Sequence, residues 1–138
     1  MVEIFRFGVS LPKSLINKFD QLIKEKGYSN RSKAIADLIR QELIKKQWQL
    51  NKEVAGAITL IYNHHKRELL DKIIDTQHDF QNLIISTQHI HLDKNNCLEI
   101  IAVKASAEDA QKLVDTLRAI KGIKHATLSM SSTGREIE

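Results

Sequence analysis

Three histidines and the only cysteine of the chain lie within a 20-residue window, at His78, His89, His91 and Cys97. His89 and His91 are two residues apart, so on a β-strand both side chains emerge on the same face. If residues 92–96 connect this strand to the next, Cys97 pairs with His91 across the hairpin, with Cβ atoms about 5 Å apart. His78 is then the candidate fourth ligand, from this chain or from a neighbouring one.

Three imidazoles and one thiolate suit several late transition metals, including nickel, copper, zinc and cobalt. A planar arrangement favours Ni(II) or Cu(II), and a tetrahedral one favours Zn(II). The four ligands leave no position open for a substrate, and the sequence has no Ser-His-Asp set, phosphate-binding Gly-rich loop or pair of catalytic carboxylates. The pattern therefore argues against a metalloenzyme, and we do not expect the chain to be an enzyme. The other histidines, His64, His65 and His125, lack such company and are expected at the surface or at strand ends.

The elements that must position these ligands follow the order strand, helix, strand, strand, helix, strand. Apolar periodicity predicts them at residues 54–62, 66–79, 83–92, 97–104, 107–120 and 123–130. This βαββαβ order is typical of an α+β ferredoxin-like sandwich, with both helices on one face of an antiparallel sheet. Ile101 and Val103 are expected to pack under the helices and not to line a ligand pocket. The other face needs a cover as well, which implies a partner subunit.

The amino-terminal part alternates apolar and polar side chains from Ile4 to Leu11, as a half-buried strand does. Pro12 then opens a helix that Gly27 ends, and Ser29 or Asn30 caps a second helix that runs to Trp48. One short strand with two helices makes too small a core, so we expect this βαα unit to pair with a copy of itself. The result is the layout of the ribbon-helix-helix DNA-binding dimers.

In such a dimer the two-stranded ribbon enters the major groove of double-stranded DNA. The outward residues would be Arg6, Gly8 and Ser10, with Arg6 placed to donate two hydrogen bonds to guanine. The backbone N–H groups at the start of the second helix, near Ser29, Asn30 and Arg31, would bind a DNA phosphate; these six positions are the predicted DNA contacts of this unit.

Charge supports a division of the chain into residues 1–48 and 53–138. The first 50 residues hold ten basic and five acidic side chains, a net +5, and the remainder is −1, which together give the +4 of the whole chain. A basic module is suited to a polyanion. The single cysteine excludes an intramolecular disulfide, and no apolar run reaches the roughly 18 residues of a membrane span, so we expect a cytoplasmic protein with no membrane partner.

The segments FRFGVSLPKSL…GYSNRSKAIADLIR and QHDF…STQHIHLDKNNCLEI together resemble the nickel-responsive repressor family, NikR. The resemblance implies square-planar Ni(II), one per subunit, bound by His89, His91 and Cys97 of one subunit and His78 of another. It implies a homotetramer of two DNA-binding dimers around four ACT-like domains, in which nickel promotes operator binding and represses nickel-uptake genes. Four further positions match the family: Tyr62 and Glu99 support the site, and Lys66 and Arg67 touch the DNA backbone.

Two departures from the family pattern affect what is carried over. Gly8 stands where members often have a short polar side chain, so the operator contacts can differ. Some members bind a second cation between the domains, beside the position of Asp37, with an acidic residue where this chain has Lys33. The Lys33 ammonium would either repel a metal there or replace its charge.

Other functions remain open at this stage. A regulator of the same architecture could respond to copper or to an amino acid, and a ribbon-helix-helix antitoxin would bind a toxin through its carboxy-terminal part. Metal storage or enzymatic activity would predict no sequence-specific DNA binding. No protein partner other than the chain's own copies is implied.

Overall fold

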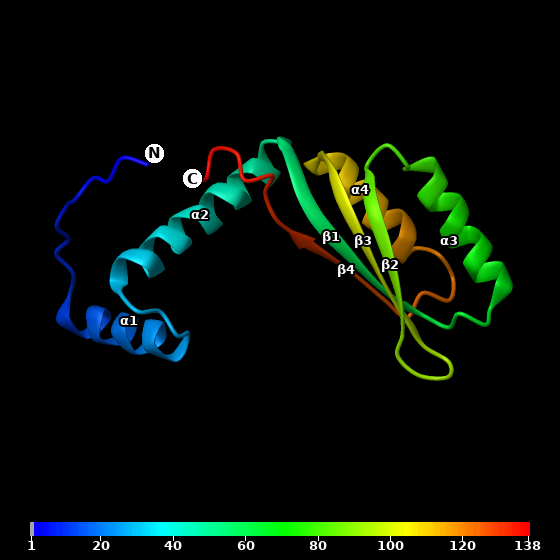
Figure 1. The fold of residues 1–138 in the computed structure, drawn as a ribbon, viewed down its shortest axis with the longest axis horizontal. Helices are drawn as coiled ribbons and strands as arrows, with labels where there is room; N and C mark the ends of the chain where they lie inside the picture. Colours follow the sequence, from blue (N-terminus) through cyan, green and yellow to red (C-terminus); the bar gives the residue numbers. More distant parts are fainter. Residues whose placement is uncertain (1) are drawn as a thin grey trace. The chain divides into compact units, whose positions relative to one another are not determined.

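The computed structural model describes residues 2–138 and divides the chain into two compact units. One unit runs up to Leu43 and includes the last three residues, Glu136–Glu138; the other is Ile44–Arg135. Figure 1 labels the elements of both.

The amino-terminal unit holds two helices, α1 (Lys13–Glu25) and the first part of α2 (Arg31–Gln49). Pro12 precedes α1, and its carbonyl accepts the N–H groups of Leu15 and Ile16. Gly27 has φ of 79°, the left-handed conformation that a helix end favours in glycine. Of the two predicted caps for α2, Asn30 fills the position, because its Oδ1 accepts the Lys33 N–H at 2.9 Å. Both helices are therefore confirmed.

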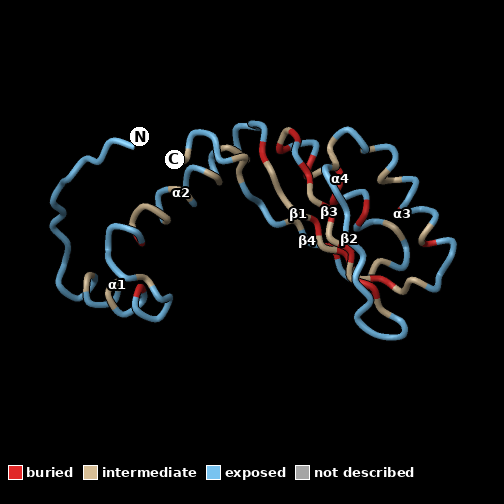
Figure 2. Tube along the Cα trace, viewed as in Figure 1, coloured by how far each residue is buried: buried red, intermediate tan, exposed pale blue. Residues whose placement is uncertain are grey.

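The strand predicted at residues 4–11 is absent from the single chain, in which residues 2–12 carry no regular structure. Its apolar side chains are exposed, with Phe5 at 85% and Phe7 at 66%. Figure 2 colours the segment next to the N label as exposed. The physical reason is that an antiparallel ribbon needs a second strand to accept and donate its backbone hydrogen bonds, and one chain supplies only one strand. Pairing with a second copy stays a prediction.

The carboxy-terminal unit has the predicted βαββαβ order. Its elements are β1 (Glu53–Tyr62), α3 (Arg67–Asp79), β2 (Ile84–His91), β3 (Cys97–Ser106), α4 (Ala107–Arg118) and β4 (His125–Met130). The strands form one antiparallel sheet in the order β2-β3-β1-β4 (Figure 1). α4 packs on β1, β3 and β4, and α3 packs beside α4.

Burial alternates along β1 and β3, so the sheet has one covered face and one open face. On β3 the residues that face the helices are fully buried, including Ile101 and Val103, which confirms that these two pack in the core. The residues between them, such as Leu98 and Ile100, are only partly buried. The open face lacks a cover among the described residues.

The last turn of α2 belongs to this second unit and packs on its sheet. The Trp48 indole N–H donates to the Ser131 carbonyl at 2.9 Å. Trp48 approaches β1 at Gly56, where an added Cβ would lie 2.9 Å from the Ser129 carbonyl and 3.6 Å from the indole. Only glycine fits there. Within residues 2–138 the structure has no helix that is long and apolar enough to cross a membrane.

Candidate metal centre

The β2–β3 hairpin brings three of the four predicted ligands to one face of the sheet. His91 pairs directly with Cys97, and His89 pairs with Glu99, as the count of five connecting residues predicts. The connection is held by Asp93, whose Oδ1 accepts the N–H groups of Asn95 and Asn96, both at 2.9 Å. The side-chain amide of Asn96, together with these backbone hydrogen bonds, lowers the pKa of Asp93. The hydrogen bonds of Asp93 therefore stabilise the turn whose length sets the register and places Cys97 opposite His91.

Cys97 is 2% exposed, and its pair on β1 is Tyr62. The thiol lies on the helix-covered face of the inner strand β3, whereas His89 and His91, on the edge strand β2, are exposed. The face thus presents two exposed imidazole rings beside a buried sulfur. Such a mixed N and S donor set suits the late transition metals.

Glu99 is the one buried charged side chain among the described residues, with no exposed surface. A buried carboxylate needs hydrogen-bond donors, and Glu99 has three. Its Oε1 accepts the Tyr62 hydroxyl at 2.8 Å and lies 2.9 Å from His89 Nε2, and its Oε2 accepts the amide of Gln77. Burial and the hydrogen bond to Glu99 raise the pKa of Tyr62, so the phenol stays protonated and keeps donating.

This network also fits a metal site in the way it holds His89. Histidines that ligate metals commonly give their second ring nitrogen to a carboxylate, which fixes the orientation of the ring. Glu99 and Tyr62 both approach the His89 ring, the latter at 3.4 Å from Nδ1. The donor chemistry and the orienting carboxylate are compatible with a site for a late transition metal, nickel included. Gln77, which connects α3 to this carboxylate, gave no signal in the sequence.

His64 corrects one prediction, because it does not lie apart from the cluster. Its ring meets the ring of His91 edge-on at 4.7 Å between centroids, and the ring of His65 at 4.1 Å. Its Nδ1 is buried with no hydrogen-bond partner among the described atoms, and burial lowers its pKa. The reason is that the segment after β1 turns towards the end of β2, although β3 separates the two strands in the sheet. His65 is exposed as predicted, with Nε2 2.7 Å from the Lys94 carbonyl.

The fourth predicted ligand is not part of this face. His78 lies exposed in the last turn of α3, directly after Gln77. Within residues 2–138, no three histidine, cysteine or acidic side chains of one chain lie close enough to hold a metal ion. The hairpin therefore supplies an incomplete set of ligands.

The predicted DNA contacts lie at the surface of the amino-terminal unit. Arg6, Gly8 and Ser10 are exposed, and nothing lies within 4 Å of a Cβ built at Gly8. Arg31 is already engaged, since its guanidinium donates to both carboxylate oxygens of Asp20 at 2.8 and 2.7 Å. This bond lowers the pKa of Asp20. A phosphate at the start of α2 would thus meet backbone N–H groups and not a free Arg31 side chain.

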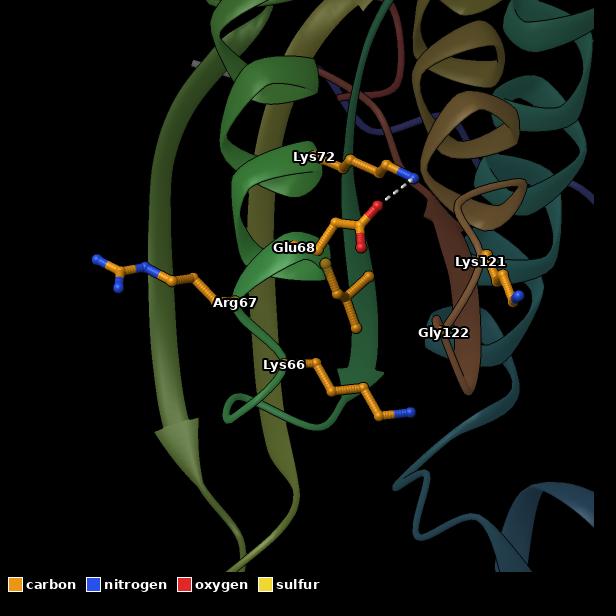
Figure 3. A pocket seen from close by; sticks show the side chains of 7 residues that line it. Lys66, Arg67, Glu68, Lys72, Lys121 and Gly122 are labelled. Carbon is orange, nitrogen blue, oxygen red and sulfur yellow. Dashed lines mark ion pairs between the residues drawn. The ribbon is translucent and has the colours of Figure 1, made fainter.

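Lys66 and Arg67 lie at the start of α3, beside a shallow pocket that Figure 3 shows from close by. Lys66, Arg67 and Lys121 are among the residues that line this pocket, and in the view the Arg67 side chain points away from Lys121. Glu68 pairs with Lys72 at 3.6 Å. Lys121 was missed in the sequence because it follows a different helix, and only the turn at Gly122, with φ of 104°, brings it here.

Comparison with known proteins gives two family matches that together span most of the chain. The NikR C terminal nickel binding domain matches residues 55–131, and the ribbon-helix-helix protein, copG family, matches residues 6–46. A protein of Syntrophus aciditrophicus named "Putative nickel-responsive regulator" is 59% identical over 98% of this chain and 98% of its own length. One of Pyrococcus furiosus with the same name is 50% identical over 97% and 98%. These relatives are regulators and not enzymes.

A solved structure shares the fold at low identity. An uncharacterized protein of Thermotoga maritima superposes with a TM-score of 0.51 at 13% identity, over 56% of this chain and 95% of its own. The likeness concerns the fold alone.

Proposed function

The chain belongs to the nickel-responsive regulator family, and from that premise we propose that it is a repressor whose binding to operator DNA is promoted by Ni(II) and that controls nickel-uptake genes. The observation that carries the proposal is the hairpin register, which sets His91 opposite Cys97 and His89 opposite a buried Glu99.

We assign one Ni(II) per subunit to His89, His91 and Cys97 of one chain together with His78 of a neighbouring chain. Support for the shared site comes from the position of His78, which lies in α3 and outside the hairpin that carries the other three ligands. Bound nickel would supply a positive centre that joins two subunits. The chain's own residues contribute the donors and hold them in orientation, with Glu99 and Tyr62 fixing the ring of His89.

The DNA-binding form requires a dimer of the amino-terminal unit. Phe7, Val9 and Leu11 line an apolar hollow with α1 and α2 that one chain leaves open to solvent. A second copy would fill it and pair the two strands into a ribbon. Arg6, Gly8 and Ser10 would then face base edges. The N–H groups near Ser29, Asn30 and Arg31, with the side chains of Lys66 and Arg67, would bind phosphates.

Two such dimers would meet through the open faces of their sheets, where Leu98, Ile100 and Ile61 are only partly buried. We expect the dimers to form a homotetramer in which the nickel sites lie between subunits. We expect it to work in the cytoplasm, where its operator lies.

The switch itself is a shift between populations of subunit arrangement. Nickel can favour the DNA-binding arrangement only to the extent that it binds that arrangement better, about 1.4 kcal/mol for each tenfold gain in operator affinity. A site shared between chains has this property, because its ligands come together in one arrangement and separate in others.

Titration of the purified protein with nickel, followed by binding to labelled DNA from upstream of a nickel-uptake operon, tests the proposal. The expected result is tight operator binding only with nickel, loss of the response in Cys97→Ala, and a visible absorption band of planar nickel-thiolate. Equal affinity with and without nickel would overturn the repressor assignment. A response that survives in Cys97→Ala would point to an effector other than a thiolate-bound metal.

A further inference from the structure

Asp37 of α2 lies at the centre of a charged cluster in the amino-terminal unit. Its Oδ1 accepts from the Lys33 ammonium at 2.8 Å and from the Arg40 guanidinium at 3.2 Å. Its Oδ2 accepts from the Tyr28 hydroxyl at 2.8 Å. Both carboxylate oxygens are thus occupied by donors of the same chain, and two of these donors are cations.

The resemblance to the family implies a second cation beside Asp37 in some members, where an acidic residue stands in place of Lys33. The residues present here do not fit a metal ion. A metal would have to displace the Lys33 ammonium and approach the Arg40 guanidinium, and it would gain only one carboxylate. The Lys33 and Tyr28 hydrogen bonds lower the pKa of Asp37, so the carboxylate stays ionised at neutral pH and continues to hold both partners.

The Asp37 carboxylate, whose charge is balanced by Lys33 and Arg40, connects three parts of its unit. Tyr28 lies in the turn between α1 and α2, where its N–H bonds to the Ile23 carbonyl at 2.9 Å. Lys33, Asp37 and Arg40 lie on one face of α2 at spacings of four and three residues. Arg40 also donates through Nε to the Ile137 carbonyl at 2.8 Å, which holds the end of the chain.

Resting on the function proposed above, we propose that Lys33 is a built-in cation: its ammonium occupies the Asp37 position that relatives with an acidic residue there fill with a free cation. Operator binding by the nickel-loaded protein therefore needs no additional free cation beside Asp37. The Lys33 side chain is 57% exposed, so the pair adds little to stability. The proposed role of Lys33 is to keep a positive charge beside Asp37, because an ammonium attached to the chain is present at any salt composition.

Replacement of potassium and sodium by tetramethylammonium at constant ionic strength tests this, because the bulky cation cannot enter a carboxylate pair while general salt effects on DNA binding stay fixed. Divalent ions other than nickel are removed beforehand by passage over a chelating resin. The nickel-loaded wild type is expected to bind operator DNA equally well in both salts. Lys33→Glu, which places two carboxylates four residues apart, should bind about tenfold more weakly in tetramethylammonium and recover in potassium or calcium, a change of about 1.4 kcal/mol.

Lys24→Glu is the matched control, because it makes the same change of charge on an exposed residue at the end of α1. It should show no recovery specific to potassium. A wild type that weakens in tetramethylammonium as Lys33→Glu does, or a Lys33→Glu variant that ignores the cation, would overturn the inference.

The thermal unfolding midpoint of the metal-free proteins gives a second readout that involves neither nickel nor DNA. Potassium or calcium should raise the midpoint of Lys33→Glu and leave those of the wild type and Lys24→Glu unchanged. This separates the two proposals. Absence of any nickel response in either salt overturns the repressor function, whereas the unfolding data alone still decide whether Lys33 replaces a cation.

Discussion

The amino-terminal unit buries two apolar side chains in the single chain, Ile23 and Ala34, whereas the carboxy-terminal unit encloses a continuous core under its two helices. Both units are built from apolar residues at regular spacing. The difference lies in the sheet: four strands that pair within one chain satisfy their own backbone and cover each other, but one strand cannot.

The comparison reverses when the chemistry is considered. The amino-terminal unit carries the predicted DNA-contacting side chains at its surface but has a small core. The carboxy-terminal unit has a large core, but His78, the fourth predicted metal ligand, lies outside the face that carries the other three. We therefore expect each unit to be completed by a second copy, one for its core and the other for its metal site. Changes at these two kinds of position should have effects of different kind and size.

The largest effect on stability is expected at the ribbon. Phe7→Ala removes a side chain that is 66% exposed in the single chain and that we expect to be buried in the dimer. The free energy of unfolding of the dimeric unit should fall by about 3–5 kcal/mol, with loss of operator binding. Ile4→Ala, on the other side of the same segment, should cost much less. Chemical denaturation and sedimentation measure both; equal effects of the two changes would remove the case for the ribbon.

The largest effect on nickel binding is expected from the shared site. His78→Ala and Cys97→Ala should each weaken nickel binding at least about 100-fold. When the two variants are unfolded and refolded together, a site built from the Cys97 side of one chain and His78 of the other becomes complete. Random pairing across a two-fold interface then restores about a quarter of the sites. No recovery in the mixture would mean that all four ligands come from one chain.

A smaller effect is expected at the buried carboxylate. Tyr62→Phe removes one donor from Glu99, which should lower the free energy of unfolding by about 1–2 kcal/mol and weaken nickel binding about tenfold. Tyr28→Phe is the matched change in the other unit, where the hydroxyl serves Asp37. It should leave nickel binding unchanged in a competition assay with a coloured chelator. If both changes weaken nickel binding alike, the effect of Tyr62 is not local.

The smallest effect concerns acid. Nickel binding needs neutral imidazoles and an ionised thiol, so it should weaken as the pH falls and protons compete with the metal. Asp20 and Asp37 have pKa values below the ordinary 3.8, so their pairs stabilise the amino-terminal unit above that pH and lose this contribution as the pH falls below it. Asp20→Asn should flatten the stability curve below pH 4 without moving the pH at which nickel is released. Circular dichroism and nickel release over the same pH series distinguish the two.

The elements of the carboxy-terminal unit and the hairpin register were predictable from the sequence. Apolar periods of 3.6 and 2 residues are local properties, and the five residues before Cys97 leave one register that keeps its side chain on the buried face. The covered positions of Ile101 and Val103 follow from the same alternation. Helices α1 and α2 were likewise predictable, because their capping residues and the helical spacing of their apolar residues are local features of the sequence.

Contacts between distant segments were not predictable in this way. Nothing in the spacing of His64 indicates that its ring meets His91, nor that Gln77 reaches Glu99 or that Arg31 is held by Asp20. Each of these contacts joins two elements, and the distance between the elements depends on the conformation of the turn that connects them. The unpaired ribbon segment shows the same dependence, because its hydrogen-bonding partner lies outside the chain.

The sequence by itself determined which residues are candidate metal ligands, the helices and strands that carry them, and the shared face of the hairpin residues, because these depend on residue type and on short-range periodicity. Only the tertiary structure decided that Glu99 is buried against His89 and that Lys33 pairs with Asp37. Those outcomes depend on distances between elements far apart in sequence, which packing fixes and periodicity does not.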